Sequence, residues 1–229
     1  MRSLWRTLDG GLLRDIALVC LADGVVGASF GAIAVSGGQP GWVPVAMSLL
    51  VFAGGAQFAA LGIVLAGGNP LAAVVAGLVL NARHLPFGFA VADALGNRLP
   101  TRLTGAHVMI DESVAFTIAQ RDPARRRAAF WTCGLLLFAT WNIGVLAGVF
   151  AGRLIGDPNT FGLDAASPVV LLALVLPSLR DTGTLRAALL GGVLALASTP
   201  FLPAGVPVAV ALVGLLLAGR PKVAQEVSA

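Results

Sequence analysis

The sequence predicts an all-α polytopic membrane protein, a bundle of about seven to eight transmembrane segments of which some are broken or re-entrant. Of its 229 residues, 57% are hydrophobic and 11% are charged, and the mean hydropathy is +0.90, which excludes an ordinary soluble domain. Residues 24–82 contain no Asp, Glu, Lys or Arg, a run long enough for two helices of about 20 residues and a turn. Further charge-free runs cover 128–152, 165–179 and 187–219.

Short turns rich in glycine and proline separate the expected segments. The turns at 37–41 and 67–70 end the first and second segments. We expect one integral membrane domain over residues 1–229, with an interfacial N-terminal part at 1–15, a helical bundle at 16–219 and a cytoplasmic tail at 220–229. The expected membrane segments are 16–35, 42–65, 71–95, 104–120, 128–152, 165–179, 185–199 and 204–218.

Segment 104–120 decides the topology. It is short, and it could cross the bilayer, lie in the interface, or dip in and return. If it crosses and the N-terminus is cytoplasmic, eleven basic residues are cytoplasmic: Arg2, Arg6, Arg14, Arg121, Arg125, Arg126, Arg127, Arg180, Arg186, Arg220 and Lys222. Three are then outside: Arg98, Arg102 and Arg153. Basic residues accumulate on the cytoplasmic side of membrane proteins. We therefore predict a crossing, with both termini cytoplasmic.

The third segment, 71–95, carries Asn81, Arg83 and His84 near its middle. A cation at bilayer depth costs at least about 2.5 kcal/mol, so Arg83 needs a partner or a wet cavity. Pro86 is expected to remove the helical hydrogen bond to the Ala82 carbonyl. Polar groups beside broken backbone are tolerated in a membrane only where they face protein or a cavity. The segment is therefore the first candidate for a transport site.

The second segment has Gly54, Gly55 and Gln57 at its midpoint. A helix break at the two glycines would point the N–H groups of the following half-helix into a cavity, where they bind a carboxylate. Gln57 would add a side-chain donor. The alternative is that the glycines only allow close helix packing.

Acidic groups follow in the fourth segment. Arg83 is expected to pair with Asp111 or Glu112, because a lone charge in either segment is costly. His107 and Asp111 are four residues apart and would share one helical face. If the segment is embedded, Asp111 and Glu112 could attract a substrate ammonium group or carry a coupling proton.

Three further polar or aromatic residues are candidates of a second rank. Asn142 is expected to line the cavity or to form a hydrogen bond across helices, and Trp141 to pack structurally. Asp23 would pair with Arg83, bind a cation or reach the interface.

Other classes of protein fit the sequence less well. The basic residues are scattered over loops, which argues against a nucleic-acid partner. Cys20 and Cys133 lie in apolar segments without metal-ligand spacing, so neither a metal nor a cofactor is expected. An intramembrane enzyme using His84, Asp111 and Glu112 is an alternative, although the chain has no HExxH or GxSxG motif. A passive channel or scaffold subunit is another.

Five motifs occur in an order that resembles AzlC-type proteins. They are Phe52-Ala53-Gly54-Gly55-Ala56-Gln57-Phe58, Asn81-Ala82-Arg83-His84, Asp111-Glu112-Ser113, Thr140-Trp141 and Phe161-Gly162-Leu163-Asp164. The resemblance covers residues 15–219, and Asp23 and Asn142 are not part of it. It implies the large subunit of a bacterial branched-chain amino acid exporter in the inner membrane. It also implies a small AzlD-type membrane partner, an amino acid substrate and a secondary transport mechanism.

Overall fold

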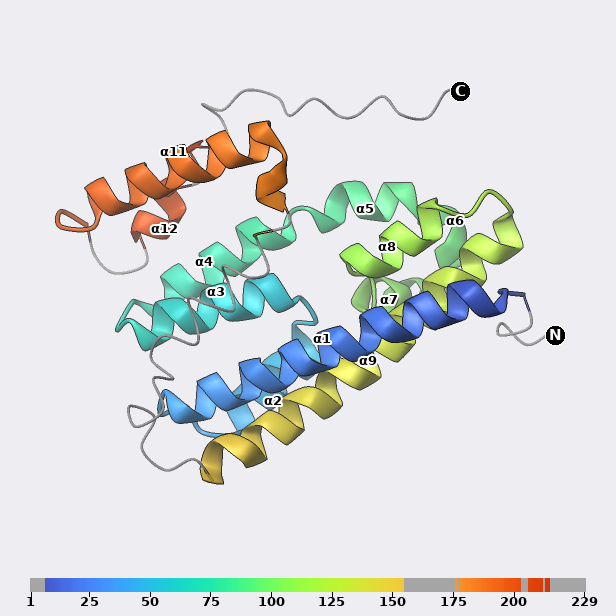
Figure 1. Ribbon diagram of the computed structural model, residues 1–229, viewed down its shortest axis with the longest axis horizontal. Coiled ribbons are helices and arrows are strands. Elements are labelled where there is room, and N and C mark those ends of the chain that lie inside the picture. Colours follow the sequence, from blue (N-terminus) through green and yellow to red (C-terminus); the bar gives the residue numbers. More distant parts are fainter. Residues whose placement is uncertain (1–6, 155–175, 177, 203–205, 212, 215–229) are drawn as a thin grey trace. The chain divides into compact units, whose positions relative to one another are not determined.

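The computed structural model describes residues 7–154, 176, 178–202, 206–211 and 213–214, and every regular element in them is a helix (Figure 1). The all-α class is thus confirmed. The described residues form two compact units, 7–57 with 79–154 and 58–78 with those after 175. Among them, three helical stretches are long and apolar enough to cross a bilayer: Gly10–Ser36 (α1), Pro70–Ala90 and Pro123–Leu154 (α9). The number of about seven to eight segments stays a prediction, because much of segments six and eight lies outside the described residues.

Helices α1 and α9 form the frame of the first unit and run side by side in the same direction (Figure 1). At their N-terminal ends, Asp9 forms an ion pair with Arg125. Near their C-terminal ends, a methyl group placed on Gly152 would lie 3.0 Å from the Ala32 carbonyl oxygen. The two N-terminal ends therefore face the same side of the membrane.

Glycines allow the close approach of these two helices. A methyl group on Gly31 would clash with the Val145 carbonyl oxygen, and one on Gly148 would clash with the Ala28 carbonyl oxygen. Because backbone atoms cannot move aside as side chains do, only glycine fits at these positions. Gly27 makes a contact of the same kind, since a methyl group there would lie 2.8 Å from the Trp141 carbonyl oxygen. Helix α1 also begins at Gly10, inside the part at 1–15 expected to be interfacial.

The second segment is broken into α2 (Trp42–Leu50) and α3 (Gly54–Leu65), with residues 51–53 outside both helices. Helix α2 packs along α9, and the Ser48 hydroxyl donates a hydrogen bond of 2.7 Å to Asn142 Oδ1. Helix α2 thus runs along α9 from its C-terminal end, where Gly41 lies against Arg153, to its middle, where Ser48 binds Asn142. The expected break in this segment is confirmed.

The third segment is divided into α4 (Pro70–Asn81), α5 (His84–Ala90) and α6 (Ala92–Leu95). Its last part returns to the N-terminal end of α9, where Asp93 forms an ion pair of 2.8 Å with Arg126. The guanidinium of Arg126 holds the pKa of Asp93 below its usual range. Helices α2, α5 and α6 therefore span the unit in the direction opposite to α1.

The break in this third segment lies just before the helical turn that contains Pro86. Residues 82–83 form the interruption, and Pro86 sits in the first turn of α5, where its missing N–H costs nothing. The Ala82 carbonyl is not free, because it accepts a hydrogen bond of 3.1 Å from the Leu85 amide. The carbonyl that faces an imidazole is that of Asn81, 3.0 Å from His84 Nδ1.

The fourth segment forms a helical hairpin, which corrects the predicted crossing. Helix α7 (Leu99–His107) starts after Gly96, which lies against the Arg127 guanidinium. Helix α8 (Asp111–Ile118) ends before Gln120, which accepts a hydrogen bond of 3.2 Å from Arg125. Both ends of the hairpin thus lie beside the first turns of α9.

The joint of the hairpin, residues 108–110, lies deeper in the unit. A methyl group on Gly134 would lie 2.8 Å from the Val108 carbonyl oxygen, and the His107 ring contacts Phe138. Residue 134 is about 12 Å along α9 from residue 126, at 1.5 Å of rise per residue. The segment therefore dips in and returns. Arg98 and Arg102 then join the basic residues at the N-terminal end of α9, which satisfies the orientation rule better than a crossing does.

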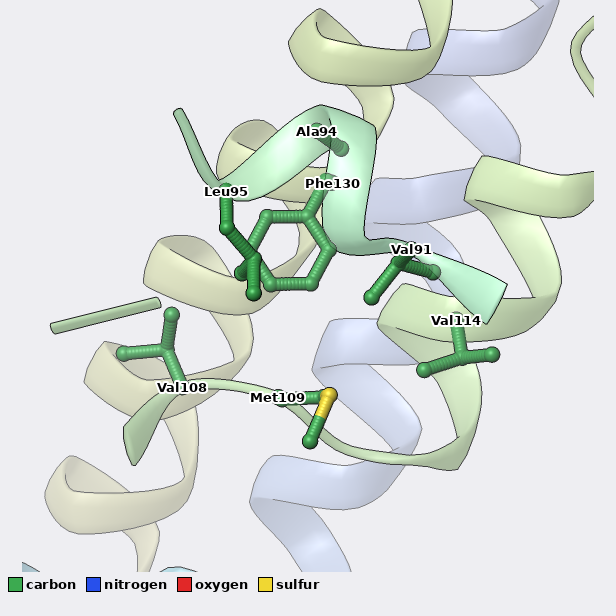
Figure 2. Close-up of a cluster of buried hydrophobic side chains, with 7 residues drawn as sticks. All are labelled: Val91, Ala94, Leu95, Val108, Met109, Val114 and Phe130. Atoms are coloured by element: carbon green, nitrogen blue, oxygen red, sulfur yellow. The ribbon is translucent and has the colours of Figure 1, made fainter. Parts of the chain in front are cut away.

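A hydrophobic cluster holds the hairpin, α6 and α9 together. Phe130 of α9 lies at its centre and has no exposed surface (Figure 2). Its members are Val91, Ala94, Leu95, Val108, Met109, Val114 and Phe130. Because the cluster draws on α6, the hairpin joint, α8 and α9, it fixes the joint in place.

The second unit contains the tip of the α3–α4 hairpin and the described C-terminal helices. Ile63 packs against Ala73 and Ala76, and Gly67 makes the turn with a φ of 74°. Elsewhere in this unit, α11 (Thr182–Ser198) contacts α12 (Val206–Ala211).

Candidate functional site

Three helix breaks of the first unit meet at one cavity. The breaks are 51–53 between α2 and α3, 82–83 between α4 and α5, and 108–110 between α7 and α8. The cavity has a volume of about 250 Å³. Its lining residues are Leu50, Val51, Phe52, Ala53, Asn81, His84, Ala106, His107 and Met109. Six of these nine are apolar, so the cavity suits a small molecule with an apolar part and a few polar atoms.

Arg83 lies beside the start of α3 and is paired with Asp111. Its Nη2 atom is 2.9 Å from Asp111 Oδ2, and the two side chains are 37% and 38% exposed. The same Nη2 atom would lie 3.8 Å from a methyl group placed on Gly55. The predicted ion pair is thus formed with Asp111. A guanidinium and the open N-terminus of a 12-residue helix therefore face one another, and both attract anions.

The two glycines at the start of α3 do different things. A methyl group on Gly54 would lie 2.8 Å from Cη2 of Trp141, so this glycine is required for packing. Gly55 is exposed and faces Arg83. The packing interpretation therefore holds for Gly54, and the open position expected at a carboxylate site is found at Gly55.

Gln57 holds the break in place. Its side chain has no exposed surface, and its Nε2 atom donates hydrogen bonds of 3.2 Å and 2.6 Å to the carbonyls of Met47 and Val51. These carbonyls lie at the C-terminal end of α2, and they also accept hydrogen bonds of 2.8 Å and 2.7 Å from the amides of Val51 and Ala53. The Gln57 amide nitrogen is therefore occupied by backbone. It is not available as the substrate donor that the sequence suggests.

Asn81 and His84 both line the cavity, although the helix is interrupted between them. The buried Asn81 Oδ1 atom has no hydrogen-bond partner among the described residues. The His84 ring is engaged by the Asn81 carbonyl and contacts Phe87. An unsatisfied amide oxygen beside a cavity is suited to accept a hydrogen bond from a ligand.

The acidic residues of α8 separate into two environments. The shared helical face predicted for His107 and Asp111 is wrong, because α7 ends at His107 and α8 begins at Asp111. His107 instead lines the cavity. Glu112 and Asp23 each keep one buried carboxylate oxygen without a partner among the described residues. Among the described residues, Arg83 forms its ion pair with Asp111 and not with Asp23.

Asn142 and Trp141 hold the break from the side of α9. Asn142 binds Ser48 across helices and donates from Nδ2 to the Phe138 carbonyl at 2.8 Å. Trp141 is 4% exposed and packs against Gly54 and Phe30. The cross-helix bond and the structural packing expected for these residues are confirmed, and neither residue lines the cavity.

Several residues of the site are not evident from the sequence. The walls formed by Leu50, Val51, Ala106 and Met109 consist of ordinary apolar residues that belong to none of the five motifs. One signal does mark the hairpin joint. Asp111 and Glu112 stand in the first turn of α8, where acidic side chains are favoured, and the Ser113 hydroxyl accepts from the Ile110 amide at 2.9 Å.

Comparisons with known proteins agree with this architecture of apolar helices. The family described as AzlC protein matches residues 18–155. An uncharacterized membrane protein of Archaeoglobus fulgidus is 34% identical over 177 residues, which are 75% of this chain and 76% of that protein. An uncharacterized membrane protein of Helicobacter pylori is 27% identical over 75% of each chain.

A third relative carries a functional name. The branched-chain amino acid transport protein AzlC of Bacillus subtilis is 30% identical over 141 residues, which are 61% of this chain and 55% of that protein. No solved structure matches the chain. The family match covers the region that contains all three helix breaks, the Arg83–Asp111 pair and the cavity. The chain therefore belongs to the AzlC family of membrane proteins.

Proposed function

We propose that this protein is a secondary transporter that exports branched-chain or other neutral apolar amino acids across the bacterial inner membrane. The observation that carries the proposal is the meeting of three helix breaks at one cavity, whose wall includes His84, the neighbour of Arg83 in the chain. Discontinuous helices near the middle of a membrane are a common way to build a substrate site in transporters. The name of the Bacillus subtilis relative supports the same class of substrate.

The cavity and the adjoining start of α3 together offer a separate place for each part of a zwitterion. The carboxylate binds at Gly55, where the N–H groups of the first turn of α3 have no helical partner and Arg83 supplies a positive charge. The Asn81 Oδ1 atom accepts a hydrogen bond from the ammonium group. The apolar side chain occupies the space between Val51, Ala106 and Met109. Asp111 balances Arg83 when no substrate is bound.

Export coupled to a proton would use Glu112 and Asp23, the acidic residues that are not part of the Arg83–Asp111 ion pair. Glu112 and Asp23 each have a buried carboxylate oxygen without a described partner. A carboxylate in a poorly hydrated place does not ionise readily. We therefore propose that these two residues take up the proton, and that a small AzlD-type membrane subunit completes the exporter.

Counterflow in proteoliposomes tests the proposed function. Vesicles that contain the chain, with and without its small partner subunit, are loaded with unlabelled leucine and diluted into a trace of labelled leucine. A carrier accumulates the label transiently, because exchange is faster than net loss. Labelled lysine serves as the control substrate, since the cavity offers its second cation no acidic partner. Flux without saturation would indicate a channel, and no flux in either preparation would refute the proposal.

A further inference from the structure

Met109 belongs to the cavity and to the hydrophobic cluster at the same time. It lines the cavity and is 6% exposed. It is also a member of the cluster around Phe130, and Figure 2 shows its thioether between Val108 and Val114. Because the hairpin joint carries Met109, the backbone at this point is fixed by the cluster rather than by a helix. The side chain therefore forms a wall between the cavity and the packed core.

We infer that Met109 sets the upper size limit of the amino acid side chain that the cavity accepts. This inference rests on the proposed function and names the residue that determines its specificity. Val114 is a member of the same cluster as Met109 and is not among the cavity residues. Shortening Met109, by contrast, adds space to the cavity without changing its polar groups.

The wall formed by Met109 is adaptable but has a definite limit. A methionine side chain has three rotatable bonds and fills irregular spaces, so it adjusts to branched aliphatic groups of different shape. The limit comes from the hydrophobic cluster, in which Met109 packs with Val91, Val108 and Phe130 and is 6% exposed. An aromatic ring in the cavity has to displace the Met109 side chain against this packed cluster. Leucine, isoleucine and valine do not.

Substitution of Ala106 can make the cavity smaller, whereas shortening Met109 makes it larger. Ala106 lines the cavity from the last turn of α7, is exposed, and is not a member of the cluster. A leucine at this position takes space from the cavity without removing any core contact. It should exclude large substrates and still admit alanine.

The test compares substrates within each variant in the counterflow assay, using labelled leucine, phenylalanine and alanine. Met109→Ala should raise the phenylalanine-to-leucine rate ratio about tenfold or more, since one to a few methylene groups in an apolar pocket discriminate by 10- to 200-fold. Ala106→Leu should lower the leucine-to-alanine ratio by a similar factor. Val114→Ala is the matched control, because it removes cluster packing but no cavity wall, and its ratios should equal those of the wild type.

The outcomes separate the inference from the proposed function. If the wild type exchanges leucine but neither Met109→Ala nor Ala106→Leu changes its ratio, the inference is wrong and the transport function stands. An equal change in Val114→Ala would also overturn it, because the effect would then come from loosened packing. If Met109→Ala does not fold, Met109→Val, which shortens the same side chain less, takes its place and should also raise the phenylalanine-to-leucine ratio. If the wild type exchanges no leucine, the proposed function itself fails.

Discussion

Arg83 combines two roles that the sequence presents as alternatives. Its ion pair with Asp111 is structural, yet the same guanidinium nitrogen faces the N-terminus of α3 at Gly55. Both partners are more than one-third exposed, so the pair contributes only about 0.2–1 kcal/mol to stability. The main effect of the pair is therefore expected on substrate binding rather than on folding.

Charge exchange tests this role. Arg83→Ala and Asp111→Ala should each lower leucine counterflow at least about tenfold, since a charged hydrogen bond contributes about 1.5–3 kcal/mol. The double change Arg83→Asp with Asp111→Arg should recover part of the loss. The matched control, Arg83→Glu with Glu112→Arg, should recover none, because Glu112 does not form the ion pair. Equal recovery in both double variants would contradict the assignment of Asp111.

Gln57 is expected to act on stability. Gln57→Leu keeps the approximate size of the side chain but removes its two hydrogen bonds to the carbonyls of Met47 and Val51, which should cost about 0.5–1.5 kcal/mol for each bond. Thermal unfolding in detergent measures the change. Gln39→Leu, in the turn before α2, is the control and should be near neutral. An unchanged Gln57→Leu protein would show that the α2–α3 break does not depend on this amide.

Single residues explain how much of the site the sequence could predict. Arg83, His84 and Gly55 were identifiable because charge and glycine in an apolar segment carry an energetic cost. The role of Gln57 was not, because a buried amide looks the same whether it binds backbone or ligand. Ala106 and Met109 carry no signal at all, since only the fold brings them to the cavity.

At the scale of elements, the parallel contact of α1 and α9 is the feature that depends most on glycine. Gly148→Ala should disrupt it, because the added methyl group would overlap the Ala28 carbonyl oxygen. Gly192→Ala in α11 is the matched control, since nothing lies within 4 Å of its methyl group, and it should be neutral or stabilising by up to about 1 kcal/mol. The yield and thermal stability of the two purified variants provide the comparison. Equal stability would contradict the close contact.

The hairpin of α7 and α8 gives a topology prediction. In a protein with Cys20→Ala and Cys133→Ala, single cysteines at Arg98 and Asp122 should react with a membrane-impermeant thiol reagent from the same side. A cysteine at Gly38, in the turn after α1, should react from the other side. Labelling of positions 98 and 122 from opposite sides would restore the crossing that the count of basic residues favoured.

The hairpin also shows why element boundaries were only partly predictable. The breaks at glycine in the second segment and near proline in the third have local signals in the chain. The break at 108–110 follows instead from long-range packing of Val108 and Met109 around Phe130. The count of basic residues places the cluster at 121–127 on the cytoplasmic side in both topologies. The two topologies differ in the side on which Arg98 and Arg102 lie, so the count alone does not reveal the hairpin.

At the scale of the whole molecule, the proposed transport function depends on one cavity. Helix breaks from three separate parts of the chain supply its walls, and the frame of α1 and α9 holds these parts at a common depth. The apolar cluster around Phe130 lies next to this cavity and shares Met109 with it. A transport cycle in which the hairpin joint moves would therefore change the cavity and the cluster together.

Protection of a cysteine in the cavity by leucine tests this central claim most directly. Ala106→Cys, in a protein without Cys20 and Cys133, is labelled with a small thiol reagent at increasing leucine concentration, with Arg98→Cys as the control outside the cavity. We predict that leucine slows labelling at position 106 in a saturable manner and leaves position 98 unaffected. An unchanged labelling rate at position 106, in vesicles that still show leucine counterflow, would place the substrate elsewhere and contradict the account.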